Sequence, residues 1–481
     1  MVHTYNFDNK NIVLDVDSGI VHVVSDEAYA AISATGDSIA ASDVSAEVAA
    51  EIEQLRARGL LYSEHDYSAY ARGSKVLKSL CLHVAHDCNL RCGYCFAGAG
   101  EYGGSRGIMT ADTARAAVDF LVRGSGGRKL LEIDFFGGEP LLAWDTVTAT
   151  VDYAAARYPD ITFSFTITTN GLLLDDAKTD YINEHMYNVV LSLDGRRSVN
   201  DKTRPTESGA GSYDVVAPKF RELVRRRTNP ADTDTPAVGD NSATDRAAVI
   251  NAVNANPAVT NAVVNANPTD SNHANSNTGK RNRDYYVRAT FTRDNLDFAA
   301  DVRHIYDLGF RNISAEPCTG SPYGITEADV PRVLAEYETL YHWLKTRPDA
   351  LFFHFNIDLN LAHAPCIIRR LRGCGCGTEY AAVTPDGAVY PCHQYAGTAE
   401  YRLGDVWGGI DPDAGDRLVD YFADTNVYSK AGCSECFAKY YCGGGCNALF
   451  KQTCGSENTP ADVYCTLMRK RVELAIAMQC G

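Results

Sequence analysis

Three cysteines stand close together just after the first strongly apolar run in the central part of the chain. The segment Cys88-Asn-Leu-Arg-Cys92-Gly-Tyr-Cys95 gives them CxxxCxxC spacing. Three thiolates on one short loop can bind three irons of a cubane cluster and leave the fourth iron open, and cysteine is the usual ligand of such clusters. An open coordination position is typical of a catalytic metal, whereas a zinc knuckle, the structural alternative, normally adds a fourth ligand. The spacing therefore predicts a catalytic iron–sulfur site.

A second and larger set of cysteines lies in the C-terminal part of the chain. The N-terminus lacks the pattern of a secretory signal, so we expect a cytoplasmic, reducing location in which cysteines serve metals or catalysis rather than disulfides. The pattern predicts a loop-rich region held together by metal, with purely structural zinc sites as the alternative. The cysteines concerned are Cys374, Cys376, Cys392 at the end of the element GAVYPC, Cys433, Cys436, Cys442, Cys446 and Cys465.

Polar motifs also stand at the ends of three β-rich runs. They are Gly137–Pro140 (GGEP), Thr168–Gly171 (TTNG) and Ser192–Gly195 (SLDG). Gly137 and Gly138 would let the backbone approach a ligand closely, because neither carries a side chain. Catalytic groups collect at the carboxyl ends of parallel strands in barrel folds, so we expect these motifs to meet in one site.

The elements that must position these motifs are β-rich runs that alternate with helical patterns. This alternation predicts βαβ units, a parallel sheet and the α/β fold class, with a partial barrel as the expected form. One helix is expected over Thr110–Val122, with the Thr110 side chain as its cap. The expected strands are Leu80–Val84, Leu130–Phe136, Thr162–Thr168, Val189–Leu193, Tyr285–Thr290 and Asn312–Ala315.

The first 75 residues read as a separate, noncatalytic unit. Ile12–Val24 predicts a hairpin around Asp17-Ser18-Gly19, and Ser45 can cap a helix that ends before Gly59. The short run Leu60–Tyr62 is expected to form another strand. Hairpin, helix and strand together suggest a small winged-helix-like fold with a binding role.

The remaining chain divides by composition. Residues 76–330 hold the strand and helix alternation, residues 331–365 form a bridging helical segment, and residues 366–481 are rich in Gly, Cys and Tyr, as in a loop-rich metal domain. Within the alternation, residues 229–284 contain almost no large apolar side chains and repeat the sequence NANP. Such a segment cannot bury enough apolar surface to fold, which predicts a disordered surface insertion.

The overall charge excludes some functions. The chain has 481 residues, with 45 Lys and Arg against 61 Asp and Glu, and therefore a formal net charge of −16. This balance disfavours general binding to nucleic acid phosphates. No apolar run approaches the roughly 20 residues that a membrane-spanning helix requires, so no membrane partner is expected.

With these motifs in this order, the chain resembles the radical S-adenosylmethionine superfamily, and its cysteine-rich end resembles the SPASM domain. The resemblance implies a partial (β/α)6 radical SAM barrel and three [4Fe–4S] clusters, one on Cys88, Cys92 and Cys95 and two auxiliary ones. It also implies that the open iron chelates S-adenosylmethionine, which is cleaved reductively to a 5′-deoxyadenosyl radical.

The same resemblance assigns cofactor contacts. In the family, the GGEP segment receives the ammonium group of S-adenosylmethionine, and positions that match Ser192 and Arg204 contact its ribose and carboxylate. Arg288 is a further polar candidate, with an ion pair to a nearby carboxylate as the alternative. The full set of candidates is Gly137, Gly138, Glu139, Pro140, Thr169, Asn170, Ser192, Asp194, Arg204 and Arg288.

For the auxiliary clusters, the resemblance implies two ligand sets. Cys433, Cys436, Cys442 and Cys465 would hold one cluster, and Cys374, Cys392 and Cys446 the other, with Cys376 as a further candidate. Because only one glycine separates Cys374 from Cys376, we expect one of them, Cys374, to bind and to leave an iron open for a substrate thiol. A fully ligated cluster that only relays electrons is the alternative.

Within the SPASM group, the chain is most similar to the maturases of SCIFF peptides, from IVLDVDSGIVHVV through LHVAHDCNLRCGYCF, DFFGGEP and TITTNG to AVTPDGAVYPCHQY. That similarity implies a cysteine-to-carbon thioether crosslink in a ribosomally made, cysteine-rich precursor peptide, recognised by the N-terminal unit. It also implies a low-potential electron donor such as ferredoxin or flavodoxin.

Two alternatives stay open. An anaerobic sulfatase maturase would oxidise Cys or Ser to formylglycine, but that group carries an Asp where His393 follows Cys392. A non-catalytic iron–sulfur electron carrier or binding module would not require the GGEP segment or a three-thiolate loop.

Overall fold

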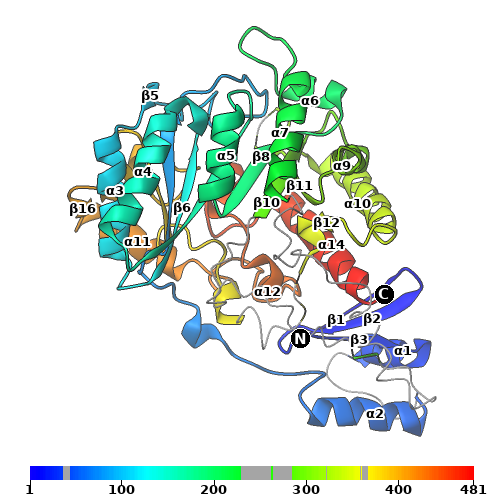
Figure 1. Cartoon of the computed structure of the whole chain (residues 1–481). Helices are drawn as coiled ribbons and strands as arrows, with labels where there is room; N and C mark the ends of the chain where they lie inside the picture. Colours follow the sequence, from blue (N-terminus) through cyan, green and yellow to red (C-terminus); the bar gives the residue numbers. More distant parts are fainter. Residues whose placement is uncertain (36–43, 229–261, 264–283, 321, 358, 360–366) are drawn as a thin grey trace.

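The centre of the molecule is a sheet of six parallel strands whose helices pack outside it (Figure 1). The computed structural model describes residues 1–35, 44–228, 262–263, 284–320, 322–357, 359 and 367–481. All six predicted strands are present and parallel, which confirms the expected βαβ arrangement. In sheet order they are β11 (Asn312–Pro317), β10 (Asp284–Phe291), β8 (Asn188–Ser192), β7 (Thr162–Thr169), β6 (Leu130–Gly137) and β4 (Ser79–His86).

Helices cover one face of this sheet because apolar residues alternate along the strands. In β10, for example, Tyr285, Val287 and Phe291 are buried, whereas Arg288 on the opposite face is exposed. The predicted Thr110 cap is confirmed, since its side chain accepts a hydrogen bond from the Thr113 backbone N–H. The covering helices are α3 (Ala111–Gly124), α4 (Trp144–Arg157), α5 (Asp176–His185), α6 (Arg197–Thr203), α7 (Tyr213–Arg227) and α9 (Phe298–Asp307).

The cysteine-rich part continues the same sheet rather than forming a detached domain. Strand β13 (Tyr380–Val383) pairs in parallel with β4, and β14 (Ala388–Tyr390) pairs antiparallel with β13. Helix α10 (Val330–Leu344) packs against the C-terminal helix α14 (Asp462–Gln479). The smaller elements are β5 (Gly107–Ile108), β12 (Leu351–Phe352), β15 (Gly404–Asp405), β16 (Gly409–Ile410), α11 (Ala414–Asp424), α12 (Lys439–Cys442) and α13 (Asn447–Cys454).

The N-terminal unit is a three-stranded antiparallel sheet packed against two helices. Its strands are β1 (Val2–Phe7), β2 (Lys10–Asp15) and β3 (Ile20–Val24), and its helices are α1 (Asp26–Thr35) and α2 (Ala46–Ala57). The predicted hairpin is confirmed as β2 and β3, and the Ser45 side chain caps α2 as expected.

One expected strand of this unit is absent. Leu60–Tyr62 does not form a strand, and the sequence prediction was wrong there. Gly59 and Tyr62 both have a left-handed backbone, with φ of 66° and 54°, and Leu61 is buried beside the helices instead. The edge of β3 is paired with β9 (Ala262–Val263).

The predicted insertion at residues 229–284 lies almost wholly outside the described residues. Two exceptions can be stated. Strand β9 belongs to this segment and pairs antiparallel with β3 at His22↔Val263 and Val23↔Ala262. Asp284, the last residue assigned to the insertion, is the first residue of β10, so the predicted boundary was one residue too late.

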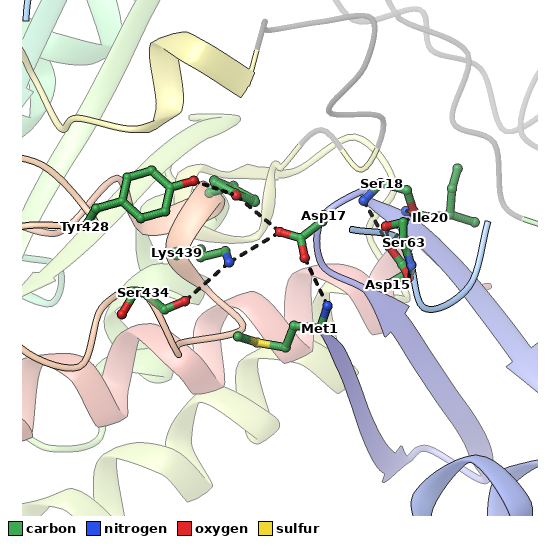
Figure 2. A network of polar contacts seen from close by, with 10 residues as sticks. Met1, Asp15, Asp17, Ser18, Ile20, Ser63, Tyr428, Ser434 and Lys439 are labelled. Carbon is green, nitrogen blue, oxygen red and sulfur yellow. Dashed lines mark hydrogen bonds and ion pairs between the residues drawn. The ribbon is translucent and has the colours of Figure 1, made fainter. Parts of the chain in front are cut away.

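A buried ion pair joins the N-terminal unit to the cysteine-rich part (Figure 2). Asp17, at the tip of the β2–β3 hairpin, lies 3.3 Å from the Nζ atom of Lys439 and accepts a hydrogen bond from the Tyr440 hydroxyl at 3.2 Å. The amino group of Met1 donates to the same carboxylate at 2.9 Å. The side chains of Asp17 and Lys439 are only 10% and 8% exposed, so each depends on the other for its charge compensation.

The helices of the described ranges include none that combines the length and the apolar character needed to cross a membrane.

We predict that Asp17→Asn destabilises the protein by about 3 kcal/mol, because it leaves the Lys439 ammonium buried without a counter-charge. Urea unfolding of the anaerobic protein, followed by circular dichroism, measures the change. Glu53→Gln removes a charge from the exposed face of α2 in the same unit and is the matched control. Adding Lys439→Met should recover part of the loss; equal stability of the Asp17 and Glu53 variants would contradict the prediction.

Candidate active site and metal centres

The three cysteines of the CxxxCxxC loop lie at the carboxyl end of β4, half-buried on one loop. The loop is shaped by its own bonds, from the Cys88 N–H to the Asp87 carboxylate at 2.8 Å and from the Cys95 N–H to the Cys92 carbonyl at 3.1 Å. The amide of Asn170 donates to the sulfur of Cys88 at 3.7 Å. The structure therefore brings together the thiols that the spacing predicted and adds one residue of the TTNG motif.

Two of these thiols, Cys88 and Cys92, have raised pKa values and need a metal to become thiolates at neutral pH. Burial, reinforced by the Glu139 charge, raises the pKa of Cys88 to about 12. Burial also raises the pKa of Cys92 to about 11, although the Arg204 charge opposes it. Metal binding displaces such protons, so the loop is suited to a group that binds thiolate strongly. In the described part of the chain no three His, Cys, Asp or Glu side chains converge on a single ion, and a cluster, whose thiolates bind different irons, does not require this.

Asp194 is a buried carboxylate that fixes the aromatic residue inside the loop. It accepts hydrogen bonds from the Tyr94 hydroxyl at 2.8 Å, the Thr203 hydroxyl at 2.7 Å and the Thr290 N–H at 3.0 Å. Arg204 donates to the Tyr94 hydroxyl at 2.7 Å. Asp194 and Arg204 thus come close to the cysteine loop as predicted, but their polar atoms hold Tyr94 between Cys92 and Cys95.

Glu139 ties the GGEP motif to the TTNG motif. Its carboxylate is 1% exposed and accepts hydrogen bonds from the Leu141 N–H at 3.0 Å, the Thr169 hydroxyl at 2.8 Å and the Asn170 N–H at 2.7 Å. Three of the predicted cofactor residues are therefore joined in one internal network. The ends of β6 and β7 are locked together by it.

The two glycines of GGEP are required by the packing of the backbone itself. Gly137 has φ of 124°, and a Cβ there would lie 2.2 Å from the Ala85 carbonyl oxygen. A Cβ on Gly138 would lie 2.1 Å from the Asp87 carbonyl oxygen. The end of β6 can approach the start of the cysteine loop this closely only without side chains.

Arg288 stands on the open face of the sheet, in a row of polar residues. It pairs in register with Ser192 of β8 and with Ser314 of β11, so these three side chains share one face. Glu316 lies two residues further along β11, and although burial alone would raise its pKa, His354, Arg471 and Arg288 hold it well below the ordinary value. From this position Arg288 can contact a ligand on the open face of the sheet, and it also acts on the Glu316 carboxylate.

Cys376 is the common neighbour in the first auxiliary group of cysteines. The Cys376 thiol contacts those of Cys374 and Cys392, and the contact with Cys376 lowers the pKa of Cys374 to about 6. Burial, followed by the charges of Cys392 and Cys374, raises the pKa of Cys446 to about 11. Cys376 thus has the thiols of Cys374 and Cys392 beside it, and Cys374 and Cys376 also line one cavity with Gly443, Gly445 and Asn447.

The second auxiliary group gathers the other four predicted ligands. Burial and the neighbouring thiols of Cys465, Cys433 and Cys436 raise the pKa of Cys442 to about 12. Cys433 and Cys436 lie in the loop before α12, Cys442 is its last residue, and Cys465 is on α14. The exposed thiol of Cys454 belongs to neither group.

Sequence reasoning missed a cluster of buried imidazoles between the two halves of the site. Nδ1 of His83 lies 3.0 Å from Nε2 of His86, and Nδ1 of His393 lies 3.2 Å from the Tyr380 hydroxyl. Burial lowers the pKa of His86 and of His393 to about 4, so both rings are neutral at neutral pH. Phe96 and Phe136 lie beside His393 with tilted rings, at 5.5 and 5.2 Å between ring centroids. Two histidines directly before a CxxxCxxC loop were the available signal.

Comparisons with known proteins agree with this geometry. Residues 82–227 match the family model described as the radical SAM superfamily, so the chain carries a radical SAM domain. The radical SAM cyclopropyl synthase TigE of Paramaledivibacter caminithermalis is 28% identical over 181 residues, 35% of this chain and 37% of that protein. The serine-type anaerobic sulfatase-maturating enzyme of Klebsiella aerogenes is 31% identical over 138 residues, 28% of this chain and 33% of that enzyme.

The likeness of fold covers a larger share of the chain than these two sequence matches. The solved structure of native anSMEcpe with bound AdoMet matches with a TM-score of 0.60 at 16% identity, over 84% of this chain and 98% of that one. The sequence matches span about a third of each of the two curated relatives, 37% and 33% of their lengths. The radical SAM domain is thus established by sequence, and the wider architecture by fold.

We predict that Cys442→Ala lowers the iron content of one auxiliary centre, because it removes one of the four thiols that gather at that centre. Iron analysis and electron paramagnetic resonance of the anaerobically reconstituted protein measure the loss. Cys454→Ala removes an exposed thiol of the same region and should leave the iron content unchanged. Unchanged iron in the Cys442 variant would exclude the proposed group.

Proposed function

We propose that the chain is a radical SAM peptide maturase that cleaves S-adenosylmethionine reductively and forms a cysteine-to-carbon thioether in a ribosomally made precursor peptide. The observation that carries the proposal is that one sheet positions two different groups of cysteines. The three-cysteine loop follows β4, and the first auxiliary group flanks the neighbouring strands β13 and β14. The radical SAM domain and the names of the relatives, which are peptide- and sulfatase-modifying enzymes, support it.

The proposed active centre uses the chain's own residues mainly for positioning. A [4Fe–4S] cluster on Cys88, Cys92 and Cys95 would supply the electron for cleavage of S-adenosylmethionine. Asp194 and Arg204 hold Tyr94, and Glu139 holds the GGEP and TTNG ends, so the loop has a fixed shape around its thiols. Since the Glu139 carboxylate is already used, we propose that the GGEP segment binds the ammonium group through backbone carbonyls.

The side chains left for S-adenosylmethionine are those on the open face of the sheet. Ser192 and Arg288 lie side by side in register at the carboxyl ends of β8 and β10. We propose that they contact the ribose and the carboxylate. Pro140, Thr169 and Asn170 contribute by shaping the loop rather than by direct contact.

For the auxiliary centres, we propose two [4Fe–4S] clusters with four cysteine ligands each. Cys433, Cys436, Cys442 and Cys465 form one set, and Cys374, Cys376, Cys392 and Cys446 the other. The position of Cys376 supports full ligation, because its thiol contacts those of both Cys374 and Cys392. Full ligation favours the alternative in which this cluster only relays electrons. It disfavours a cluster in which Cys374 or Cys376 stays unbound and leaves an iron open to the substrate thiol.

A sulfatase maturase is the second candidate, supported by the fold of anSMEcpe and by the sequence match in Klebsiella aerogenes. The position after Cys392 separates the two candidates. His393 stands where the sulfatase-maturase resemblance implies an Asp, and its buried ring is neutral. A buried neutral imidazole cannot provide the negative charge of a carboxylate, so thioether formation is the better supported reaction.

The proposed partners are a cysteine-rich precursor peptide and a low-potential electron donor such as ferredoxin or flavodoxin. We propose that the N-terminal unit binds the leader part of the peptide by adding a strand to the edge of β3. The chain's own β9 occupies two residues of this edge. A leader peptide would therefore have to displace β9 or extend beyond it.

We predict that Cys88→Ala, Cys92→Ala and Cys95→Ala each abolish 5′-deoxyadenosine formation, because two thiolates cannot hold the cluster. Chromatography of the anaerobic reaction with S-adenosylmethionine and dithionite measures the product. Cys318→Ala removes a buried thiol outside the three cysteine groups and is the control. Normal cleavage in any of the three loop variants would refute the assignment of the cluster to this loop.

We predict that a short Gly/Ser linker in place of residues 229–283 leaves S-adenosylmethionine cleavage intact and tightens binding of the leader peptide. The linker removes β9 and frees the edge of β3, while α7 and β10, which flank the segment, are unchanged. Isothermal titration with a synthetic leader measures the affinity. Weaker leader binding would show that the segment takes part in recognition instead of competing with it.

A further inference from the structure

A buried lysine stands between the two auxiliary groups of cysteines. Lys430 is 3% exposed, and its ammonium donates to the Gly444 carbonyl and to the Asn447 side-chain oxygen, both at 2.6 Å. It lines the same cavity as Cys374 and Cys376 of the first group. The thiols of Cys433 and Cys442, from the second group, are among the charges that act on it.

This ammonium lacks the counter-charge that another lysine of the region has. Lys439 is also buried, but its ammonium lies 3.3 Å from the Asp17 carboxylate. The hydrogen bonds of Lys430 go to two neutral oxygens, and the acidic groups that influence it are cysteines: Cys433, Cys442, Cys446 and Cys376. A buried cation is expensive unless negative charge lies nearby, and here thiolates are the available source.

The lysine also holds the loop that joins the two groups. Cys442 of one group and Cys446 of the other are separated by Gly443, Gly444 and Gly445, whose φ angles are 63°, 81° and 70°. A Cβ on Gly445 would lie 2.5 Å from the Phe450 ring, so the loop can take this path only as glycine. Lys430 binds the carbonyl of the middle glycine. The same ammonium therefore contacts the chain between the two ligand sets.

We infer that Lys430 is a shared electrostatic positioning residue that raises the reduction potentials of both auxiliary clusters. Each cluster gains negative charge on reduction, and a fixed positive charge in a medium of low dielectric constant stabilises the more negative state. Because one ammonium lies between the two sites, its effect should reach both. The inference rests on the proposed function only in assuming that the two cysteine groups hold iron–sulfur clusters.

The test is a redox titration of the full chain, followed by electron paramagnetic resonance. A Cys88→Ala, Cys92→Ala, Cys95→Ala background leaves the auxiliary clusters as the only signals. Lys430→Gln keeps a hydrogen-bond donor and loses the charge, and Asn447→Asp keeps the acceptor and neutralises the lysine in place. Lys451→Gln removes a charge from the partly exposed face of the nearby helix α13 and is the matched control.

We expect Lys430→Gln and Asn447→Asp to shift both auxiliary potentials to more negative values at unchanged iron content, and Lys451→Gln to leave them in place. Unchanged potentials in the first two variants, or a shift in one cluster alone, overturn the inference. If Lys430→Gln loses iron, Asn447→Asp decides, because it preserves the lysine and its hydrogen bonds. Because the titration needs no substrate, absence of crosslinking would count against the proposed function and leave this result standing.

Discussion

The pairing of β13 with β4 is the constraint on which the arrangement of the site depends. Tyr380↔Ser79 through Val383↔Leu82 form a parallel ladder that fuses the cysteine-rich part to the central sheet. The three-cysteine loop leaves the carboxyl end of β4, while Cys376 precedes β13 and Cys392 follows β14. One set of backbone hydrogen bonds thus fixes the distance between the three-cysteine loop and the first auxiliary group of cysteines. A linker between independent domains could not hold this distance.

Three buried carboxylates each join segments of the chain that are distant in sequence. Glu139 links the ends of β6 and β7, Asp194 links the cysteine loop to β10, and Asp17 links the N-terminal hairpin to Lys439. A buried carboxylate is stable only with several donors, so it enforces one geometry on the loops that supply them. Lys430 is a buried cation that also joins segments. Its ammonium donates to the Gly444 carbonyl, in the loop between the two cysteine groups, and to the Asn447 side chain just after that loop.

Local signals in the sequence predicted the local parts of the structure. Periodicity identified the six parallel strands, and the caps at Thr110 and Ser45 identified two helices, because each depends only on neighbouring residues. Cysteine spacing predicted which thiols would gather. The ladder from β4 to β13 left no such signal, since its strands are about 300 residues apart and sheet partners are not encoded in periodicity. For the same reason the pairing of β9 with the edge of β3 was not predicted.

The structure was needed to show what the predicted polar residues contact. Glu139, Thr169, Asn170, Asp194 and Arg204 were selected as cofactor contacts, yet their polar atoms bind one another or the loop. A motif shows that a residue is required near a site but not which way its side chain must point.

This distinction bears on where the substrate sulfur can go. If Cys374 and Cys376 both bind iron, as the contacts of Cys376 with Cys374 and Cys392 favour, the auxiliary cluster offers no open position. Recognition of the peptide thiol then falls to the open face of the sheet. There Arg288 provides a positive charge in register with two serines, and the neutral ring of His393 lies beside aromatic side chains. A cation can stabilise a thiolate without coordinating it, so this face could hold the substrate sulfur while the auxiliary cluster only accepts an electron.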